Sequence, residues 1–306
     1  MKIFKSIEEM RSACRAAKRA DQRLGLVPTM GALHEGHLSL VRAAREQSKV
    51  VAVSIFVNPT QFGPNEDFSK YPRGFDRDCG LLEKEGVDLV FAPSVEEMYP
   101  DGTVTWVTVE GLSDKLCGRS RPGHFRGVTT VVAKLFNVVE PDLAFFGQKD
   151  AAQLAIIRRL VRDLNFPVKV VGCPIVREPD GLAMSSRNAY LDPQQRRSAL
   201  ALHRALLEIE ELFHRGEGNP QMLICAGKRI ISQESGVRLD YLEIVDPDNL
   251  EPIPQTTWGQ PPKLALSAVE GAVQPSVARP PHNALVAIAA FVGTTRLIDN
   301  VVLNLT

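Results

Sequence analysis

Short apolar runs alternate with amphipathic segments along the first half of the chain. The apolar runs, which we expect to form buried strands, cover residues 24–30, 50–57, 87–92, 143–146 and 168–172. The amphipathic segments, which we expect to form helices, cover residues 6–20, 36–48, 75–85, 128–139 and 151–164. Strands that alternate with helices in this way predict an α/β fold, with a Rossmann-like doubly wound parallel sheet.

The pattern changes after residue 174, where we expect a second, smaller α+β domain. Amphipathic periodicity predicts two helices, and apolar runs predict two strands, over residues 195–214, 220–233, 239–245 and 284–292. We therefore expect a Rossmann-like domain over residues 1–174 and a small C-terminal domain over residues 175–306. A proline-rich stretch near residues 255–282 is typical of a surface insertion, with room for a short strand over residues 263–269.

Two further segments in the first domain carry weaker patterns. Residues 103–109 alternate β-branched side chains, which predicts another strand. Residues 118–127 hold three arginines and His124 between glycines, which is typical of a mobile basic loop.

Composition excludes several classes of protein. The 306 residues exceed the size at which one core usually keeps growing, which favours two domains. Lysine plus arginine equals aspartate plus glutamate at 36 each, so we expect no nucleic-acid or membrane surface. Five scattered cysteines form no C-x-x-C pair, and no apolar run reaches membrane-spanning length. These features predict a cytoplasmic protein.

The most informative stretch is PTMGALHEGH, residues 28–37, where an apolar strand passes into a helix. His34 and His37 fall at this junction, with Gly36 between them. Helix N-termini favour anions, and ligands of parallel sheets lie at the carboxyl ends of the strands. Two imidazoles can donate hydrogen bonds to phosphate oxygens, and Gly36 has no Cβ to block a close approach. The stretch therefore predicts a phosphate site rather than a pair of surface histidines.

Two other clusters have compatible chemistry. After the next buried strand, Lys149 offers a positive charge suited to phosphate, and Asp150 can cap the following helix, with Gln153 one turn further on. Near the join of the two domains, Ser185 and Ser186 precede an arginine, a combination that suits nucleotide phosphates. Together the three clusters predict a bound nucleotide.

Five segments in this order closely resemble the pantothenate synthetase family. They are PTMGALHEGH (28–37), FVNPTQF (56–62), RPGHFRG (121–127), FGQKD (146–150) and MSSRN (184–188). The resemblance continues to TRLIDN (295–300). It implies an ATP-dependent ligase that joins pantoate to β-alanine through an enzyme-bound pantoyl adenylate and releases AMP and pyrophosphate. It also implies Mg²⁺ and a homodimer.

The resemblance implies roles for particular side chains. The expected catalytic residues, which would hold the ATP phosphates, are His34, His37, Lys149, Ser185, Ser186 and Arg187. The other expected ATP contacts, largely through the backbone, are Met30, Gly147, Asp150, Val176 and Met184. Pantoate would meet Gln61 and Gln153, with Asn58 nearby, and the 121–127 loop would flank it. The magnesium ligands are not indicated. Because the adenylate must be kept from water, we expect the C-terminal domain to act as a lid hinged near residues 172–179.

Three other interpretations remain open on the motifs. A nucleotidyltransferase with a phosphate-bearing acceptor would use the same histidines, although Gln61 and Gln153, without an added basic residue, favour a carboxylate acceptor. A class I aminoacyl-tRNA synthetase fragment shares the His-x-Gly-His element, but the neutral charge disfavours it. A regulatory nucleotide-binding module would not need the complete set of residues.

Overall fold

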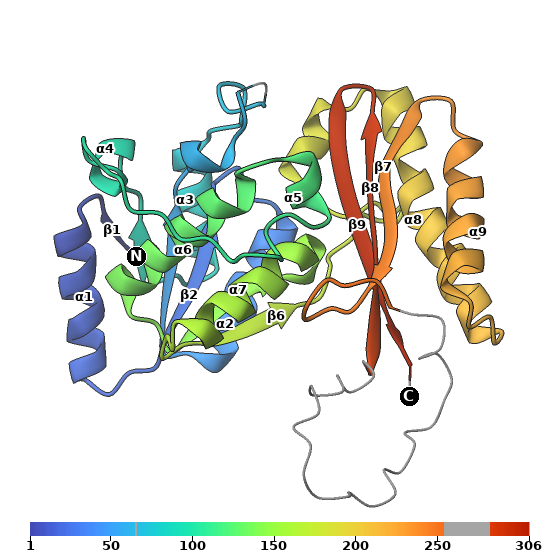
Figure 1. Cartoon of the computed structure of the whole chain (residues 1–306). Coiled ribbons are helices and arrows are strands. Elements are labelled where there is room, and N and C mark those ends of the chain that lie inside the picture. Colours follow the sequence, from blue (N-terminus) through green and yellow to red (C-terminus); the bar gives the residue numbers. More distant parts are fainter. Residues whose placement is uncertain (65, 254–281, 306) are drawn as a thin grey trace, which may run out of the picture. The chain divides into compact units, whose positions relative to one another are not determined.

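The computed structural model describes residues 1–64, 66–253 and 282–305. Contacts within the chain divide it into two compact units, Met1–Arg196 and Arg197–Thr306 (Figure 1). The division comes later in the chain than the predicted boundary, because the segment of residues 175–192 forms hydrogen bonds with the rest of the first unit. Ser186 Oγ donates to the Ala32 carbonyl at 3.1 Å, and the Tyr190 hydroxyl donates to the Lys70 carbonyl at 3.2 Å.

A six-stranded parallel sheet forms the first unit's centre; the alternation of apolar and amphipathic segments predicts five of its strands, but not the one over Lys2–Phe4. Its strands are β1 (Lys2–Phe4), β2 (Leu24–Thr29), β3 (Val50–Ile55), β4 (Leu89–Phe91), β5 (Leu143–Gly147) and β6 (Lys169–Cys173). The spatial order is β1-β4-β3-β2-β5-β6, so the chain proceeds to one side from β2 and later returns to its other side. Ligands bind at such reversals, outside the carboxyl ends of the strands.

The helices cover both faces of this sheet. The longer ones are α1 (Ile7–Arg19), α2 (Glu35–Gln47), α3 (Phe75–Lys84), α6 (His124–Val139) and α7 (Ala151–Asp163). α2 packs against α3 and buries Val41 and Ala44 against the sheet, whereas α6 packs against α1 and α7. The short helices are α4 (Val95–Met98), α5 (Cys117–Ser120), η1 (Pro59–Gln61), η2 (Gln148–Asp150) and η3 (Ser186–Tyr190). The predicted doubly wound arrangement is confirmed.

The prediction of a strand over residues 103–109 is wrong. The segment has no regular secondary structure. The Val107 amide donates to Thr130 Oγ1 at 3.0 Å, and its carbonyl accepts from Thr129 Oγ1 at 2.6 Å. Both threonines belong to α6, so side chains of a helix satisfy the backbone groups that a neighbouring strand would otherwise have paired.

The loop predicted over residues 118–127 is also partly wrong. α5 covers its start, and α6 begins at His124, four residues before the predicted helix. Gly123 precedes α6 at φ +82°, a left-handed conformation that glycine adopts without strain. The basic side chains take part in packing: Arg121 forms an ion pair with Glu66, at 2.5 Å between Nη2 and Oε2.

The second unit is the expected small α+β domain. Its helices are α8 (Pro193–His214), which begins in the first unit, and α9 (Pro220–Ser232), and its antiparallel sheet has the order β7-β8-β9. The strands are β7 (Val237–Val245), β8 (Asn283–Val292) and β9 (Thr295–Asn304), of which β9 was not predicted. The proline-rich stretch, with the short strand considered within it, lies outside the described residues except at its edges.

Within the described part of the chain, no helix combines the length and the apolar character needed to cross a membrane.

Candidate active site

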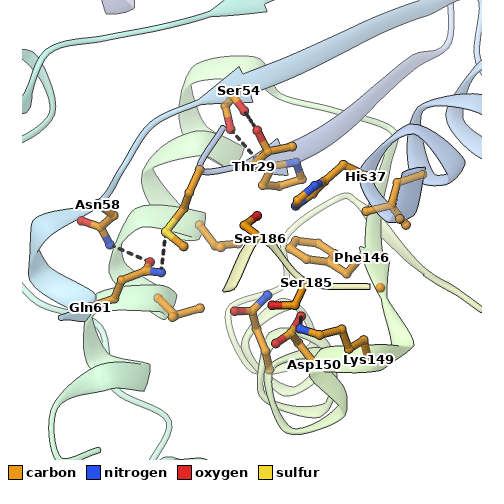
Figure 2. A pocket seen from close by; sticks show the side chains of 18 of the residues that line it. Thr29, His37, Ser54, Asn58, Gln61, Phe146, Lys149, Asp150, Ser185 and Ser186 are labelled. Carbon is orange, nitrogen blue, oxygen red and sulfur yellow. Dashed lines mark hydrogen bonds and ion pairs between the residues drawn. The ribbon is translucent and has the colours of Figure 1, made fainter. Parts of the chain in front are cut away.

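One cavity lies at the carboxyl ends of β2, β3 and β5, where the strand order reverses. Every residue that we assigned to ATP or pantoate lines it, and all belong to the first unit. They are Met30, His34, His37, Asn58, Gln61, Gly147, Lys149, Asp150, Gln153, Val176, Met184, Ser185, Ser186 and Arg187. Figure 2 shows the labelled members of this set, with Asn58 hydrogen-bonded to Gln61 and Lys149 next to Asp150.

The two histidines fix one another at the start of α2. His34 is the N-cap residue, and its Nδ1 accepts a hydrogen bond from the Gly36 amide at 3.1 Å. The His34 amide in turn donates to Nδ1 of His37 at 3.4 Å. Because each Nδ1 accepts, each ring carries its proton on Nε2. Both rings therefore keep one N–H donor available for an oxygen in the cavity.

Both rings are neutral at physiological pH. Burial, followed by the nearby Lys149, lowers the pKa of His34 to about 4. Burial, followed by the neighbouring His34 ring and Lys149, lowers the pKa of His37 to about 3. The ring centroids lie 4.1 Å apart, so protonation of one ring would disfavour protonation of the other.

Lys149 and Asp150 follow β5 and face the same cavity. Lys149 Nζ lies 3.6 Å from Asp150 Oδ2, and the two side chains are 21% and 46% exposed. Asp150 occupies the N-cap position of α7, but its side chain makes no capping hydrogen bond there, so the predicted capping role is wrong. Its carboxylate is instead directed to the lysine.

The Ser-Ser-Arg segment is held by one hydrogen bond within itself and by two partners outside it. Ser185 Oγ accepts from the Arg187 amide at 3.2 Å, while Ser186 Oγ donates to the Ala32 carbonyl at 3.1 Å. The Arg187 guanidinium forms two hydrogen bonds to the Asp67 carboxylate, at 2.9 and 3.0 Å. The segment predicted to contact phosphates is thus attached to the turn that precedes the histidines.

The amide residues form a separate group. Asn58 is only 1% exposed, and its Nδ2 donates to Gln61 Oε1 and to the Gly127 carbonyl, both at 3.1 Å. Gln61 Nε2 in turn donates to the Met30 sulfur at 2.9 Å. Asn58 therefore orients Gln61, while the Gln61 amide is the group that faces the cavity.

Some lining residues were not predicted. Tyr71 and Ser54 line the cavity but belong to no motif, and Val128, Val131, Val132 and Leu135 give it an apolar wall on α6. The helical spacing of that wall is the same pattern that a core-facing helix shows, so it carries no signal of a cavity. The loop expected near pantoate contributes two residues, Arg121 and His124.

His124 links this loop to the amide group. Its Nδ1 lies 2.8 Å from the Gln61 carbonyl oxygen, and Arg121 Nη2 donates to the same oxygen at 3.2 Å. Burial, followed by the charge of Arg121, lowers the pKa of His124 to about 4. The neutral His124 ring and the charged Arg121 side chain therefore both hold the Gln61 carbonyl oxygen.

Carboxylates are scarce around the cavity. Asp150 is the one acidic side chain among the described residues that line it. In the described part of the chain, no three histidine, cysteine, aspartate or glutamate side chains are grouped so that they could hold a metal ion. A divalent cation here would therefore depend on oxygen atoms from a ligand and from water.

Comparison with known proteins adds sequence relatives of nearly full length. A family model described as pantoate-beta-alanine ligase matches residues 2–302. The pantothenate synthetase of Koribacter versatilis is 57% identical over 304 residues, covering 99% of this chain and 96% of that protein. The pantothenate synthetase of Thermotoga neapolitana is 53% identical over 304 residues, covering 99% of this chain and all of that protein (100%).

Solved structures agree over a similar extent. The crystal structure of pantothenate synthetase from Thermus thermophilus has a TM-score of 0.84 and 45% identity, and covers 98% of this chain and 99% of that one. The pantoate-beta-alanine ligase from Francisella tularensis, solved with beta-gamma ATP and beta-alanine, has a TM-score of 0.74 and 32% identity. That comparison covers 98% of this chain and 97% of the other.

Proposed function

Because this chain belongs to the pantoate-beta-alanine ligase family and is therefore a ligase, consistent with pantothenate biosynthesis, we propose that it uses ATP to join pantoate to β-alanine. We further propose that the reaction passes through an enzyme-bound pantoyl adenylate. One observation carries this proposal: a single cavity gathers neutral imidazole donors, a lysine and a separate pair of amides. The relative solved with beta-gamma ATP and beta-alanine supports the choice of substrates.

The phosphate side of the cavity would bind ATP. The Nε2–H groups of His34 and His37 would donate to phosphate oxygens, and Lys149 would add a positive charge. The hydroxyls of Ser185 and Ser186, together with Arg187, would complete the phosphate contacts. Met30, Gly147, Asp150, Val176 and Met184 would surround the rest of the nucleotide.

The amide side of the cavity would bind pantoate. Gln61 and Gln153 are neutral, so they can hydrogen-bond the hydroxyl and carboxylate groups of pantoate without forming an ion pair. An uncharged partner leaves the carboxylate nucleophilic. The apolar wall on α6 would receive the dimethyl carbon of pantoate.

Two displacements complete the reaction. A pantoate carboxylate oxygen attacks the α-phosphorus of ATP, and the bond between the α-phosphorus and its bridging oxygen breaks to release pyrophosphate. The β-alanine nitrogen then attacks the acyl carbon, the bond from this carbon to the AMP oxygen breaks, and a proton leaves the nitrogen. The first step joins two anions, so positive charge and positioning provide most of the rate acceleration.

Mg²⁺, when bound to the ATP phosphates, would neutralise part of their charge. The donor set fits an ion of this kind, since Mg²⁺ keeps several waters and uses few protein carboxylates. Asp150, the acidic residue in the described lining, would hold it through a water molecule.

The test follows AMP and pyrophosphate with ATP, magnesium and pantoate, in the presence and absence of β-alanine. We expect multiple-turnover AMP release that needs both pantoate and β-alanine, with pantothenate as product. Exchange of labelled pyrophosphate into ATP that needs pantoate but not β-alanine would isolate the adenylate step. Binding of ATP without any effect of pantoate would overturn the acceptor assignment and favour a nucleotidyltransferase.

A further inference from the structure

The turn between β2 and α2 has an unfavourable backbone conformation. Gly31 has φ +79° and the next residue, Ala32, has φ +51°. The left-handed conformation suits glycine, but it costs an alanine about 1 kcal/mol or more. The chain reaches His34 only two residues later, so contacts that hold this turn also determine where the two imidazoles lie.

Asp78, on α3, supplies those contacts. Its side chain is 1% exposed, and its two oxygens accept separate backbone hydrogen bonds. Oδ2 accepts from the Ala32 amide at 2.7 Å, and Oδ1 accepts from the Leu33 amide at 2.9 Å. Successive amides that converge on an anion in this way form a nest, and here the anion is part of the protein.

The approach between helix and turn is close. A Cβ added at Gly31 would lie 3.1 Å from Asp78 Oδ2. Arg77, the neighbour of Asp78, donates from Nη1 to the Leu33 carbonyl at 3.0 Å. Asp78 therefore binds two backbone amides of the turn, and its neighbour Arg77 binds one backbone carbonyl of the same turn.

The turn is also the attachment point of the Ser-Ser-Arg segment. Ser186 Oγ donates to the Ala32 carbonyl at 3.1 Å, while the Ala32 amide donates to Asp78. A displacement of Ala32 would therefore move the histidines and Ser186 together. Asp78 itself is not among the residues that line the cavity.

We propose that Asp78 is a positioning residue for ATP: its carboxylate holds the strained Gly31–Ala32 turn so that His34, His37 and Ser186 address the same phosphates. This inference rests on the proposed function, since it assumes that these three residues bind ATP. The amide group around Gln61 is anchored separately, through Asn58 to the Gly127 carbonyl. The effect of Asp78 should therefore fall on ATP and not on pantoate.

The test uses Asp78→Asn, which keeps the shape but offers one acceptor and turns an N–H₂ group toward the second backbone N–H. The matched control is Asp76→Asn on the same helix. Asp76 is exposed, and its substitution removes the same negative charge near the helix N-terminus. Calorimetry with Mg-ATP gives the affinity without pantoate, and steady-state kinetics give kcat and both KM values. We expect Asp78→Asn to weaken ATP binding at least about 10-fold, since a misplacement of about 1 Å can cost about 100-fold.

For Asp78→Asn we expect the KM for pantoate to change less than about threefold, because the displaced turn carries ATP contacts only. We expect Asp76→Asn to have the ATP affinity and the KM values of the unchanged protein. An ATP affinity of Asp78→Asn within about twofold of the unchanged protein would overturn the proposal, as would equal losses for ATP and pantoate, which mark a merely structural role. If Asp78→Asn does not fold, Asp78→Ser serves instead, because its hydroxyl places no amide donor against the turn. If the unchanged protein binds no ATP, the proposed function fails, and this outcome is separate from a failure of Asp78→Asn.

Discussion

His34 and His37 are uncharged donors in the free protein, although their expected ligand carries several negative charges. Burial is the first cause, and it lowers the pKa values to about 4 and about 3. Phosphate oxygens beside the rings would favour the protonated forms, so bound ATP would raise both pKa values. Ligand binding and proton binding are therefore linked at this pair.

The linkage predicts that ATP binding takes up protons as the pH falls toward the free-ring pKa values of about 4 and about 3, because the bound rings titrate at a higher pH than the free rings. By the sign of this linkage, ATP binds more tightly as the pH falls from 7 to 5. Calorimetry in two buffers of different ionisation enthalpy gives the number of protons directly.

The nucleotide also titrates in this range, so the informative quantity is a difference between variants. His37→Gln keeps a hydrogen-bond donor but cannot gain a proton, and we expect it to take up fewer protons than the unchanged protein. Equal uptake by the two proteins would contradict the linkage and assign the protons to the nucleotide.

The residues of the site were predictable where they belong to short motifs. Residues adjacent in sequence, such as Ser185 and Ser186, stay together in any fold, so the motif carries the cluster into the cavity. Asp78 was not predictable, because in the sequence it is one of two acidic residues in the first turn of a helix. Only the packing of α3 against the turn at Ala32 distinguishes it from Asp76.

At the scale of elements, the packing of η1 against α6 determines the position of the amide group. Gly127 lies where the two meet, and a Cβ there would stand 2.4 Å from the Thr60 carbonyl oxygen. Backbone cannot yield to such a contact as a flexible side chain can. The glycine is therefore required by close approach, although it lies within a helix.

We predict that Gly127→Ala lowers the free energy of unfolding by about 1–3 kcal/mol, the usual cost of overpacking. Because Thr60 precedes Gln61, the displaced η1 should also raise the KM for pantoate, whereas the affinity for ATP should stay near its original value. Chemical denaturation and steady-state kinetics measure the two effects.

Gly80→Ala is the matched control, since a Cβ on this α3 residue would meet no atom within 4 Å. We expect it to be neutral or to stabilise by up to about 1 kcal/mol, as alanine does in a helix. A pantoate KM that is unchanged in Gly127→Ala would show that η1 does not position the amide group.

The pattern of apolar residues predicted strands well where burial alone determines that pattern. The central strands β2, β3 and β5 are buried along most of their length. Each predicted apolar run ends within two residues of the end of the observed strand. Alternation failed at residues 103–109, because α6 threonines bind the Val107 backbone and no regular strand forms. Local sequence does not show which partner a backbone group will find.

At the scale of the whole molecule, the family resemblance implies a homodimer through the N-terminal domain, and twofold dimers are the commonest soluble oligomers. Light scattering on the eluting peak of a size-exclusion column should give twice the mass of the chain at micromolar concentration. A mass equal to one chain, independent of concentration, would contradict the dimer.

The predicted role of the second unit as a lid has a chemical reason. Pantoyl adenylate is a mixed anhydride, which water would hydrolyse to pantoate and AMP, so the intermediate has to be shielded until β-alanine attacks. All the described residues that line the cavity belong to Met1–Arg196. The lid prediction therefore assigns the second unit to exclusion of water and not to binding of ATP.

We predict that ATP and pantoate together make the protein more compact, and that ATP alone has a smaller effect. The hinge expected near residues 172–179 falls inside Met1–Arg196, so it does not mark the border between the two units. Small-angle scattering of the free protein, the ATP complex and the mixture with both substrates measures the compactness. Release of AMP without β-alanine should be slow in the same mixture, because a closed lid protects the adenylate. The same compactness in all three states, combined with slow AMP release, would show that the first unit shields the intermediate by itself.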